Sequence, residues 1–422
     1  MVALVTENSF SQVADIVRDQ IVSFWGVVLF LSISIVYAFG QFFILEIVKA
    51  KNREVSGSTS TKENVITVIQ YILTSIIVFI ILEVLFSSQY HRDLLIASVT
   101  ISYGTAIFLA VLLTWKLLSW FKIQKQPIVL LYGLGSAFIV LTSVSTLIWS
   151  DAVLTQKAPV IFSESEVLFD PGFEEGSAVS FVLSLLYYFQ TTFILLLWGG
   201  TVLLLYHNFK RIGRLRFWVL TTLPIVSFMS ILISFYQELA PTSPVTEALS
   251  SNFMIPILIL NYSALAVGIV FGLSFILIGR FLKHGVHSRD YMVIAGLGFV
   301  IFIWSNGATI IQAAYPPYGI ATVSAMPLSL FMILNGLSYS AVSVAQDATL
   351  RTLIRKNVND MKFLESIGTA QMEQELQKRV LDITKKTSKT MMEESGVQPS
   401  LSEDDMKYYL QEVLQEIKAS KT

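Results

Sequence analysis

Long apolar runs separated by short polar or basic stretches dominate the sequence. Nine of these runs reach the length of about 20 predominantly apolar residues that is needed to cross the hydrocarbon core of a bilayer. Each is predicted to be a transmembrane helix, so the expected fold is an all-α bundle of nine spans. The predicted spans are Ile21–Val48, Val65–Phe86, Leu94–Leu118, Ile128–Trp149, Ala178–Tyr206, Leu215–Leu239, Met254–Leu282, Tyr291–Ala314 and Ile320–Ala345.

Lys and Arg are concentrated in alternate loops, which sets the predicted orientation. Cytoplasmic loops of membrane proteins carry an excess of these residues. Loops assigned to the outside hold only Arg92 and Lys157. The predicted topology therefore has an outside N-terminus and a cytoplasmic C-terminus. The basic clusters are Lys49/Lys51/Arg53/Lys62, Lys116/Lys122/Lys125, Lys210/Arg211/Arg214/Arg216, Arg280/Lys283/Arg289 and Arg351/Arg355/Lys356.

Composition agrees with a polytopic membrane protein and narrows its chemistry. Of 422 residues, 54% are hydrophobic and 14% are charged, and the net charge of −1 gives no basic excess for nucleic acid. The absence of cysteine excludes disulfides and thiolate sites. His284 and His287 flank Gly285 without a carboxylate set for a metal, and no catalytic or nucleotide-binding motif is present. We expect no enzyme activity, cofactor or metal.

Two segments are predicted to lie outside. Residues 1–20 suit either a short amphipathic helix at the interface or a frayed end, and the first apolar run is too long to be a signal-peptide core. The loop Ser150–Ser177 holds six acids and one Lys. It is interpreted as a solvated acidic loop, with binding of cations or a basic partner as the alternative.

Uncharged polar side chains lie within several predicted spans, whereas the acids Glu46, Glu83 and Glu238 lie near span ends. Amides in lipid seek partners. Hydrogen bonds between helices are the simpler interpretation, and a cavity for a polar substrate is the alternative. The candidate intramembrane site consists of Asn261, Asn306, Asn335, Gln312 and Gln190.

The seventh span carries Ala264, Gly268 and Gly272 at four-residue spacing. Small residues at this spacing allow two helix backbones to approach closely. We expect a helix-packing face here.

A charged tail follows the ninth span. Residues 346–395 are predicted to continue that span as a coiled-coil-like helix, with Gly368 as a weak point, and 396–422 to form a linker and an amphipathic helix. The first helix has apolar positions at Leu350, Ile354, Val358, Met361, Leu364, Ile367, Met372, Leu376, Val380 and Ile383. The second has a stripe of Met406, Leu410, Val413 and Ile417, which is expected to pack on the first tail helix, on its copy in a dimer, or on a soluble partner.

Three stretches carry a resemblance: Pro316-Pro317-Tyr318-Gly319, Ala348-Thr349-Leu350-Arg351, and the run from Ser366 to Glu375. In these the chain resembles uncharacterised polytopic membrane proteins of ammonia-oxidising archaea, best over its C-terminal third. The resemblance implies an archaeal plasma membrane. The overall form also resembles multi-span sensor modules that precede kinases, but all four histidines lie before the tail.

These observations predict a multi-pass plasma-membrane protein with its C-terminus in the cytoplasm. The leading hypothesis is a sensor or scaffold that relays or anchors through its tail without catalysis. Its partners would be the lipid bilayer and either a second copy or a soluble protein, not nucleic acid. The alternative is a transporter or channel for a small polar solute, using the asparagine-bearing spans.

Overall fold

The computed structural model describes residues 1–13, 24–56, 61–87, 90–156, 178–225, 254–281, 286–306, 317–347 and 358–395. Every regular element in these residues is a helix, so the all-α prediction is confirmed for them. The helices are α1 (Val2–Val13), α3 (Phe24–Ser56), α4 (Thr61–Ser87), α5 (Arg92–Gln124), α6 (Pro127–Gln156), α7 (Ala178–His207), α8 (Phe209–Ile212), α11 (Met254–Phe281), α12 (Val286–Ser305), α13 (Ile320–Gln346) and α15 (Val358–Ser395). Residues 214–225 are also helical.

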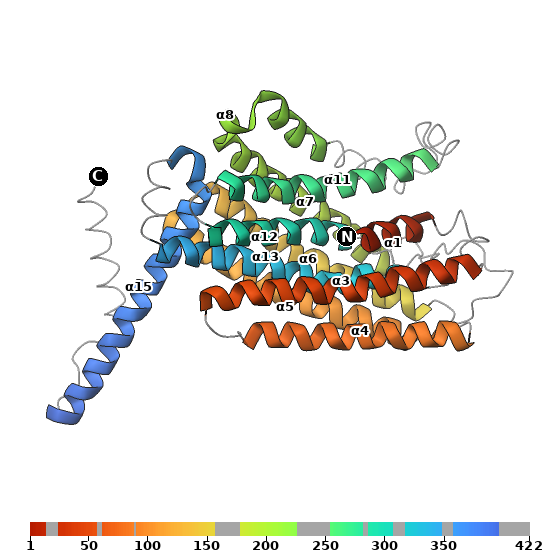
Figure 1. The fold of residues 1–422 in the computed structure, drawn as a ribbon, viewed down its shortest axis with the longest axis horizontal. Helices are drawn as coiled ribbons and strands as arrows, with labels where there is room; N and C mark the ends of the chain where they lie inside the picture. Colours follow the sequence, from red (N-terminus) through yellow and green to blue (C-terminus); the bar gives the residue numbers. More distant parts are fainter. Residues whose placement is uncertain are drawn as a thin grey trace.

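Seven of the described helices are long and apolar enough to cross a membrane: α3, α4, α5, α6, α7, α12 and α13. They run lengthwise in an elongated bundle (Figure 1). They correspond to the first five, the eighth and the ninth predicted spans. Of the two remaining predicted spans, α11 occupies the seventh, and the helical residues 214–225 cover the start of the sixth. A multi-helix membrane protein is thus supported, and the number nine stays a prediction.

A short turn joins α5 to α6. Lys125 ends α5 in the left-handed conformation, with φ 49°, and its N–H donates to the carbonyl of Phe121 at 2.7 Å. Pro127 then opens α6, where its missing N–H removes no helical hydrogen bond. The two helices therefore pack against each other over a long interface.

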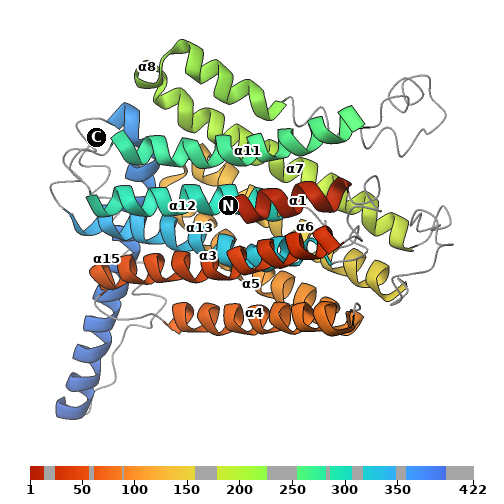
Figure 2. The ribbon, with the colours of Figure 1, turned by 45° about the vertical axis from the view of Figure 1, so that its right-hand side comes forward.

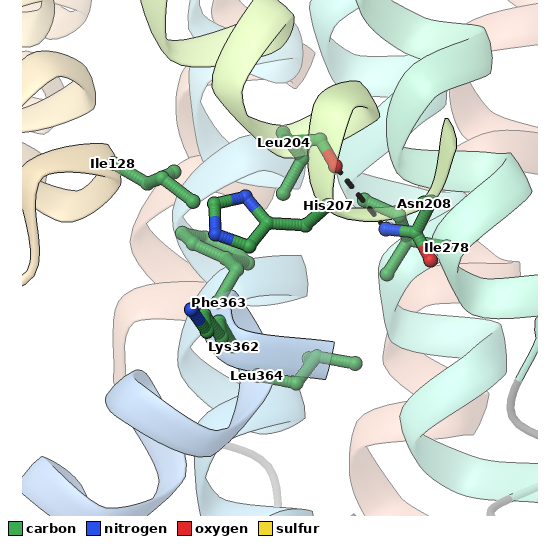
Figure 3. A pocket seen from close by; sticks show the side chains of 8 residues that line it. All are labelled: Ile128, Leu204, His207, Asn208, Ile278, Lys362, Phe363 and Leu364. Atoms are coloured by element: carbon green, nitrogen blue, oxygen red, sulfur yellow. Dashed lines mark hydrogen bonds between the residues drawn. The ribbon is translucent and has the colours of Figure 1, made fainter. Parts of the chain in front are cut away.

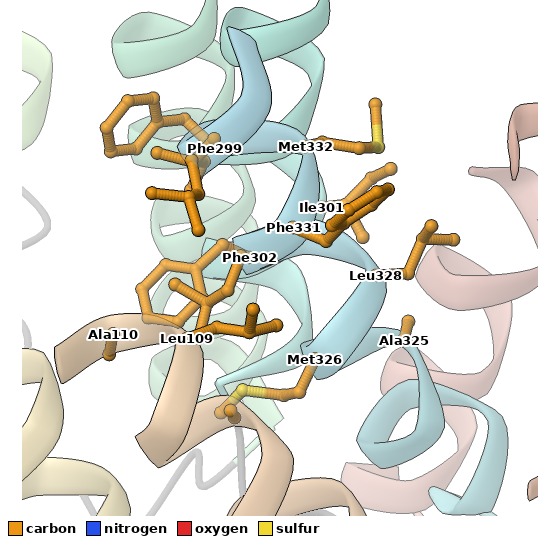
Figure 4. Packing of buried hydrophobic residues seen from close by; sticks show 14 of the residues in the cluster. Leu109, Ala110, Phe299, Ile301, Phe302, Ala325, Met326, Leu328, Phe331 and Met332 are labelled. Atoms are coloured by element: carbon orange, nitrogen blue, oxygen red, sulfur yellow. The ribbon is translucent and has the colours of Figure 1, made fainter. Parts of the chain in front are cut away.

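Helix α13 is the centre of the bundle. Every residue from Ile320 to Leu337 is buried, and α13 packs mainly against α12, α5 and α15. Figure 4 shows its Met326 and Phe331 among side chains of α5 and α12, including Leu109 and Phe302. By contrast, about a third or less of the apolar windows of α3 and α4 is buried, so these two helices lie at the periphery.

The predicted small-residue face is present where α11 meets α12. A Cβ added to Gly272 would lie 2.5 Å from the carbonyl oxygen of Gly296, and one added to Gly296 would lie 2.6 Å from that of Gly272. Only glycine allows the backbones to approach this closely. Gly268 faces Ile303 and Trp304 on the same interface.

The end of α13 corrects the prediction of one helix running from the last span into the tail. Helix α13 ends at Gln346, and its C-cap Asp347 is extended, with φ −88° and ψ 107°. An acidic side chain is unfavourable at the negative end of a helix dipole, which favours termination here. The tail helix α15 starts separately at Val358 and lies across the end of the bundle (Figure 2).

Two other predicted segments lie only partly within the described residues. Helix α12 ends at Ser305, where Asn306 and Gly307 are weak helix formers, and residues 307–314 of the predicted span lie outside the described part. Residues 1–13 of the N-terminal segment form helix α1, which runs alongside α3, with Met1 at mid-length of the bundle (Figures 1 and 2). The reason is that Ala3, Leu4 and Glu7 share a buried face.

Candidate functional site

The amino end of α13 receives its cap from a different helix. Gly319, the residue before α13, has φ 97° and no side chain to offer, so the first-turn N–H groups need another acceptor. Glu7 of α1 supplies it. One carboxylate oxygen accepts the N–H of Ala321 at 3.1 Å, and the other accepts the N–H and hydroxyl of Thr322, each at 2.6 Å. Glu7 thus replaces a local N-cap at the positive end of the dipole.

Glu7 is fully buried, with 0% of its surface exposed. Burial raises the pKa of this carboxyl above its ordinary value, while hydrogen bonds from Thr322 and from the backbone of Ala321 act in the opposite direction. A carboxyl group in such surroundings is costly unless it is hydrogen-bonded. The position of α1 and the first turn of α13 therefore depend on each other.

Helix α3 completes this end of α13. The Tyr318 hydroxyl donates to the carbonyl of Gly26 at 2.7 Å, and its ring meets Phe30 edge-on at 5.8 Å. Tyr37 is buried on the same helix and interacts electrostatically with Glu7. We call Glu7, Tyr37, Tyr318 and Thr322 the far-end junction, because it lies away from the tail.

Close to its amino end, α13 is also held by hydrogen bonds from two other neighbours. Pro327 has no N–H, which leaves the carbonyl of Val323 without its helical donor. The Ser102 hydroxyl of α5 donates to that carbonyl. On the other side, the Gln70 amide of α4 donates to the carbonyl of Ser324 at 3.4 Å. Neighbouring helices therefore fix the irregular point of α13.

At the other end of the bundle, the tail helix packs directly on α13. A Cβ added to Gly368 of α15 would lie 2.2 Å from Val344 Cγ1, so glycine is required for this contact. Phe363, Leu364 and Ile367, one turn before, are buried in the same core. The predicted weak point of the tail helix is thus its closest contact with the bundle.

Polar contacts with α5 surround this apolar contact. The Trp120 indole N–H donates to Gln371 at 3.3 Å, and the Gln124 amide donates to Glu373 at 3.2 Å. Helix α15 is therefore fixed in position and in rotation. We call the set Trp120, Val344, Phe363, Ile367, Gly368 and Gln371 the tail-end junction.

A small cavity lies beside the tail-end junction (Figure 3). His207 and Asn208 of the α7–α8 turn line it opposite Lys362 and Phe363 of α15. The Asn208 amide donates to the carbonyl of Leu204 at 3.1 Å, which closes the α7 end. The cavity volume that the centre of a water molecule can occupy is about 10 Å³. This is enough for one water and not for an organic ligand.

The predicted intramembrane polar site falls only partly within the described residues. Asn335 is buried on α13, Gln190 is partly exposed on α7, and Asn306 follows the last residue of α12. The side chains of Asn261 and Gln312 lie outside the described part. The same holds for His284 and His287, residues 157–177, and the stripe Met406, Leu410, Val413 and Ile417.

Sequence reasoning missed two buried acids. Glu7 shares a helical face with Ala3 and Leu4, a spacing that was available in the sequence. Glu63 is 1% exposed at the start of α4 and accepts the Asn52 amide of α3 at 2.8 Å. Glu46 is exposed, and Glu83 pairs with His91 at 2.5 Å.

Comparison of the chain with protein families, with curated proteins and with solved structures finds no match. The archaeal resemblance remains a prediction. The function must therefore be inferred from the two junctions themselves.

Proposed function

We propose that this protein is a membrane sensor or scaffold that relays a change from its N-terminal helix to its tail. In this proposal it is a plasma-membrane protein of an archaeon, with the far-end junction facing outward and α15 in the cytoplasm. Its output is contact between the tail and either a second copy or a soluble partner. No catalytic step is involved.

The observation that carries the proposal is that one buried helix, α13, contacts both junctions. Glu7 binds its first turn, and Gly368 packs against Val344 in its last turn. Close-packed helices transmit displacement, because their contacts cannot deform without loss of packing. A ligand or lipid that moved α1 would thereby change the docking of α15.

The test uses the reciprocity of coupled sites. Glu7→Ala should increase hydrogen exchange of α15 residues 363–374, although Glu7 does not touch α15. Glu83→Ala is a matched control, because it removes an acid that pairs with His91 and not with α13. Unchanged exchange in the tail of Glu7→Ala, with α1 itself released, would exclude the relay.

A second candidate function is passage of a small polar solute. It is favoured by a group of buried polar atoms at the α3–α4–α13 interface that have no hydrogen-bond partner among the described residues: Ser34 Oγ, Gln41 Oε1, Gln70 Oε1 and Ser324 Oγ. Polar groups buried within membrane helices commonly mark solute pathways.

Swelling of proteoliposomes in urea or glycerol separates the two candidates. A transporter would swell faster than protein-free vesicles. It would lose this activity with Gln70→Leu and keep it when residues 376–422 are deleted. A sensor would show no difference from protein-free vesicles.

A further inference from the structure

The tail helix has an apolar stripe that the bundle does not cover. Leu376, Val380 and Ile383 are 46%, 37% and 64% exposed. At 100° per residue, Leu376 lies nine residues and half a circle from the docked Ile367. The stripe therefore faces away from the bundle, on the part of α15 that extends beyond the other helices (Figures 1 and 2).

The end of the chain carries a stripe with the same spacing. Met406, Leu410, Val413 and Ile417 follow one another at steps of four, three and four residues. Leu376, Val380, Ile383 and Thr387 follow the same steps. Two helical stripes of this spacing pack as a narrow seam.

The length of chain after α15 fits an antiparallel return. Helix α15 ends at Ser395, and Ser402 is a good N-cap for a helix opened by Glu403. The six residues between them, 396–401, include Gly396 and Pro399 and match the length of a helical hairpin loop.

This loop sets the register of the hairpin. If Ser395 and Ser402 face each other, Val380 lies level with Ile417, and Ile383 lies within one residue of the level of Val413. The chain then ends at Thr422, almost level with Leu376. The C-terminal segment is thus long enough to cover the stripe.

The charges of the two segments are complementary. Residues 376–390 hold five Lys or Arg and one Asp, a net charge of +4. Residues 403–417 hold five Asp or Glu and one Lys, a net charge of −4. A second copy of residues 376–390 would instead bring two basic segments together.

We infer that residues 403–417 form a helix that folds back antiparallel on α15 and covers Leu376, Val380 and Ile383. The hairpin shields the tail face that a dimer or a soluble partner would use, so opening it exposes that face. This regulatory role rests on the proposed function, whereas the hairpin itself does not.

Cysteine cross-linking in the full-length protein tests the hairpin, because the native chain has no cysteine. Val380→Cys/Ile417→Cys should oxidise to a cross-linked monomer about tenfold faster than Lys378→Cys/Ile417→Cys, because hairpin formation gives an effective concentration of about 1 mM or more. Lys378 is the matched control because it lies on the opposite side of α15, about 160° from Val380. The rate for the first pair should fall in 1 M NaCl, where the Debye length is about 3 Å.

Equal rates for the two pairs, or no cross-linked monomer, would overturn the hairpin. Val380→Cys alone provides a further control. If it forms dimers faster than the double variant forms cross-linked monomers, a second copy covers the stripe instead. These outcomes do not depend on Glu7, so a failed relay and a failed hairpin are distinguishable.

Discussion

The two ends of α13 are held by opposite means. At the far end, one buried carboxylate from α1 accepts three hydrogen bonds from the first turn. At the tail end, Gly368 leaves room for the Val344 side chain, and the polar contacts lie around this apolar contact. The amino end of a helix has unsatisfied donors that a charge can bind, whereas a side-by-side helix contact is limited by shape. The far end is therefore sensitive to charge, and the tail end to volume.

The largest expected effect is from Glu7→Ala. The change leaves the N–H and hydroxyl of Thr322 and the N–H of Ala321 without their acceptor. Each unsatisfied buried donor costs roughly 1–3 kcal/mol, and we expect a total loss of about 3 kcal/mol because water will reach some of them. Unfolding in detergent should report this loss, and an Ala3→Cys reporter should react faster with a maleimide.

Glu7→Gln is the matched control, because its amide oxygen still accepts hydrogen bonds. It should lose clearly less stability than Glu7→Ala. Equal losses would mean that packing of α1, and not capping of α13, is the source of the effect.

Gly368→Ala comes next, with an expected cost of about 1–3 kcal/mol from overpacking. The added methyl group collides with Val344, so Val344→Ala in the same chain should restore most of the lost stability. The double variant should also recover docking of α15, measured by hydrogen exchange at residues 363–374. If Val344→Ala worsens the effect of Gly368→Ala, the two residues are not in contact.

The pH dependence of stability should come from the far end. Because burial raises the pKa of Glu7, the folded state holds this proton more tightly than the unfolded chain. The resulting stabilisation is complete below the unfolded pKa and is lost as pH rises through the folded pKa. The melting temperature of the wild type, relative to that of Glu7→Gln, should therefore decline as pH increases. The effect should be smaller than that of Glu7→Ala, because the oxygens remain in place. A difference in melting temperature that does not change with pH would contradict this prediction.

The helical segments were predictable, because a bilayer requires a fixed apolar length. The last span was predicted as Ile320–Ala345 and is found at Ile320–Gln346. The role of Glu7 was not predictable, since its partner Thr322 is 315 residues away. Gly368 was predicted only as a weak point of the tail helix, whereas its neighbour Val344 explains why glycine is there. Local patterns therefore gave the helices, but contacts between distant helices decide the junctions.

The smallest effect should come from Asp290→Asn. This substitution removes a partly exposed charge pair, which can be compared with the buried carboxylate of Glu7. Lys51 of α3 pairs with Asp290 of α12 at 3.1 Å and with Glu54 at 3.1 Å. The side chains of Lys51 and Asp290 are 33% and 24% exposed, so solvent screens their attraction. Exposed ion pairs contribute about 0.2–1 kcal/mol to stability. After the substitution, Lys51 still has Glu54 as a partner. We expect a loss below about 0.5 kcal/mol in thermal unfolding that disappears in 1 M salt, with Glu54→Gln as the matched control. A larger loss of stability that salt does not reduce would show that the bundle depends on a second charged contact besides Glu7. The contrast between the two ends of α13 would then fail.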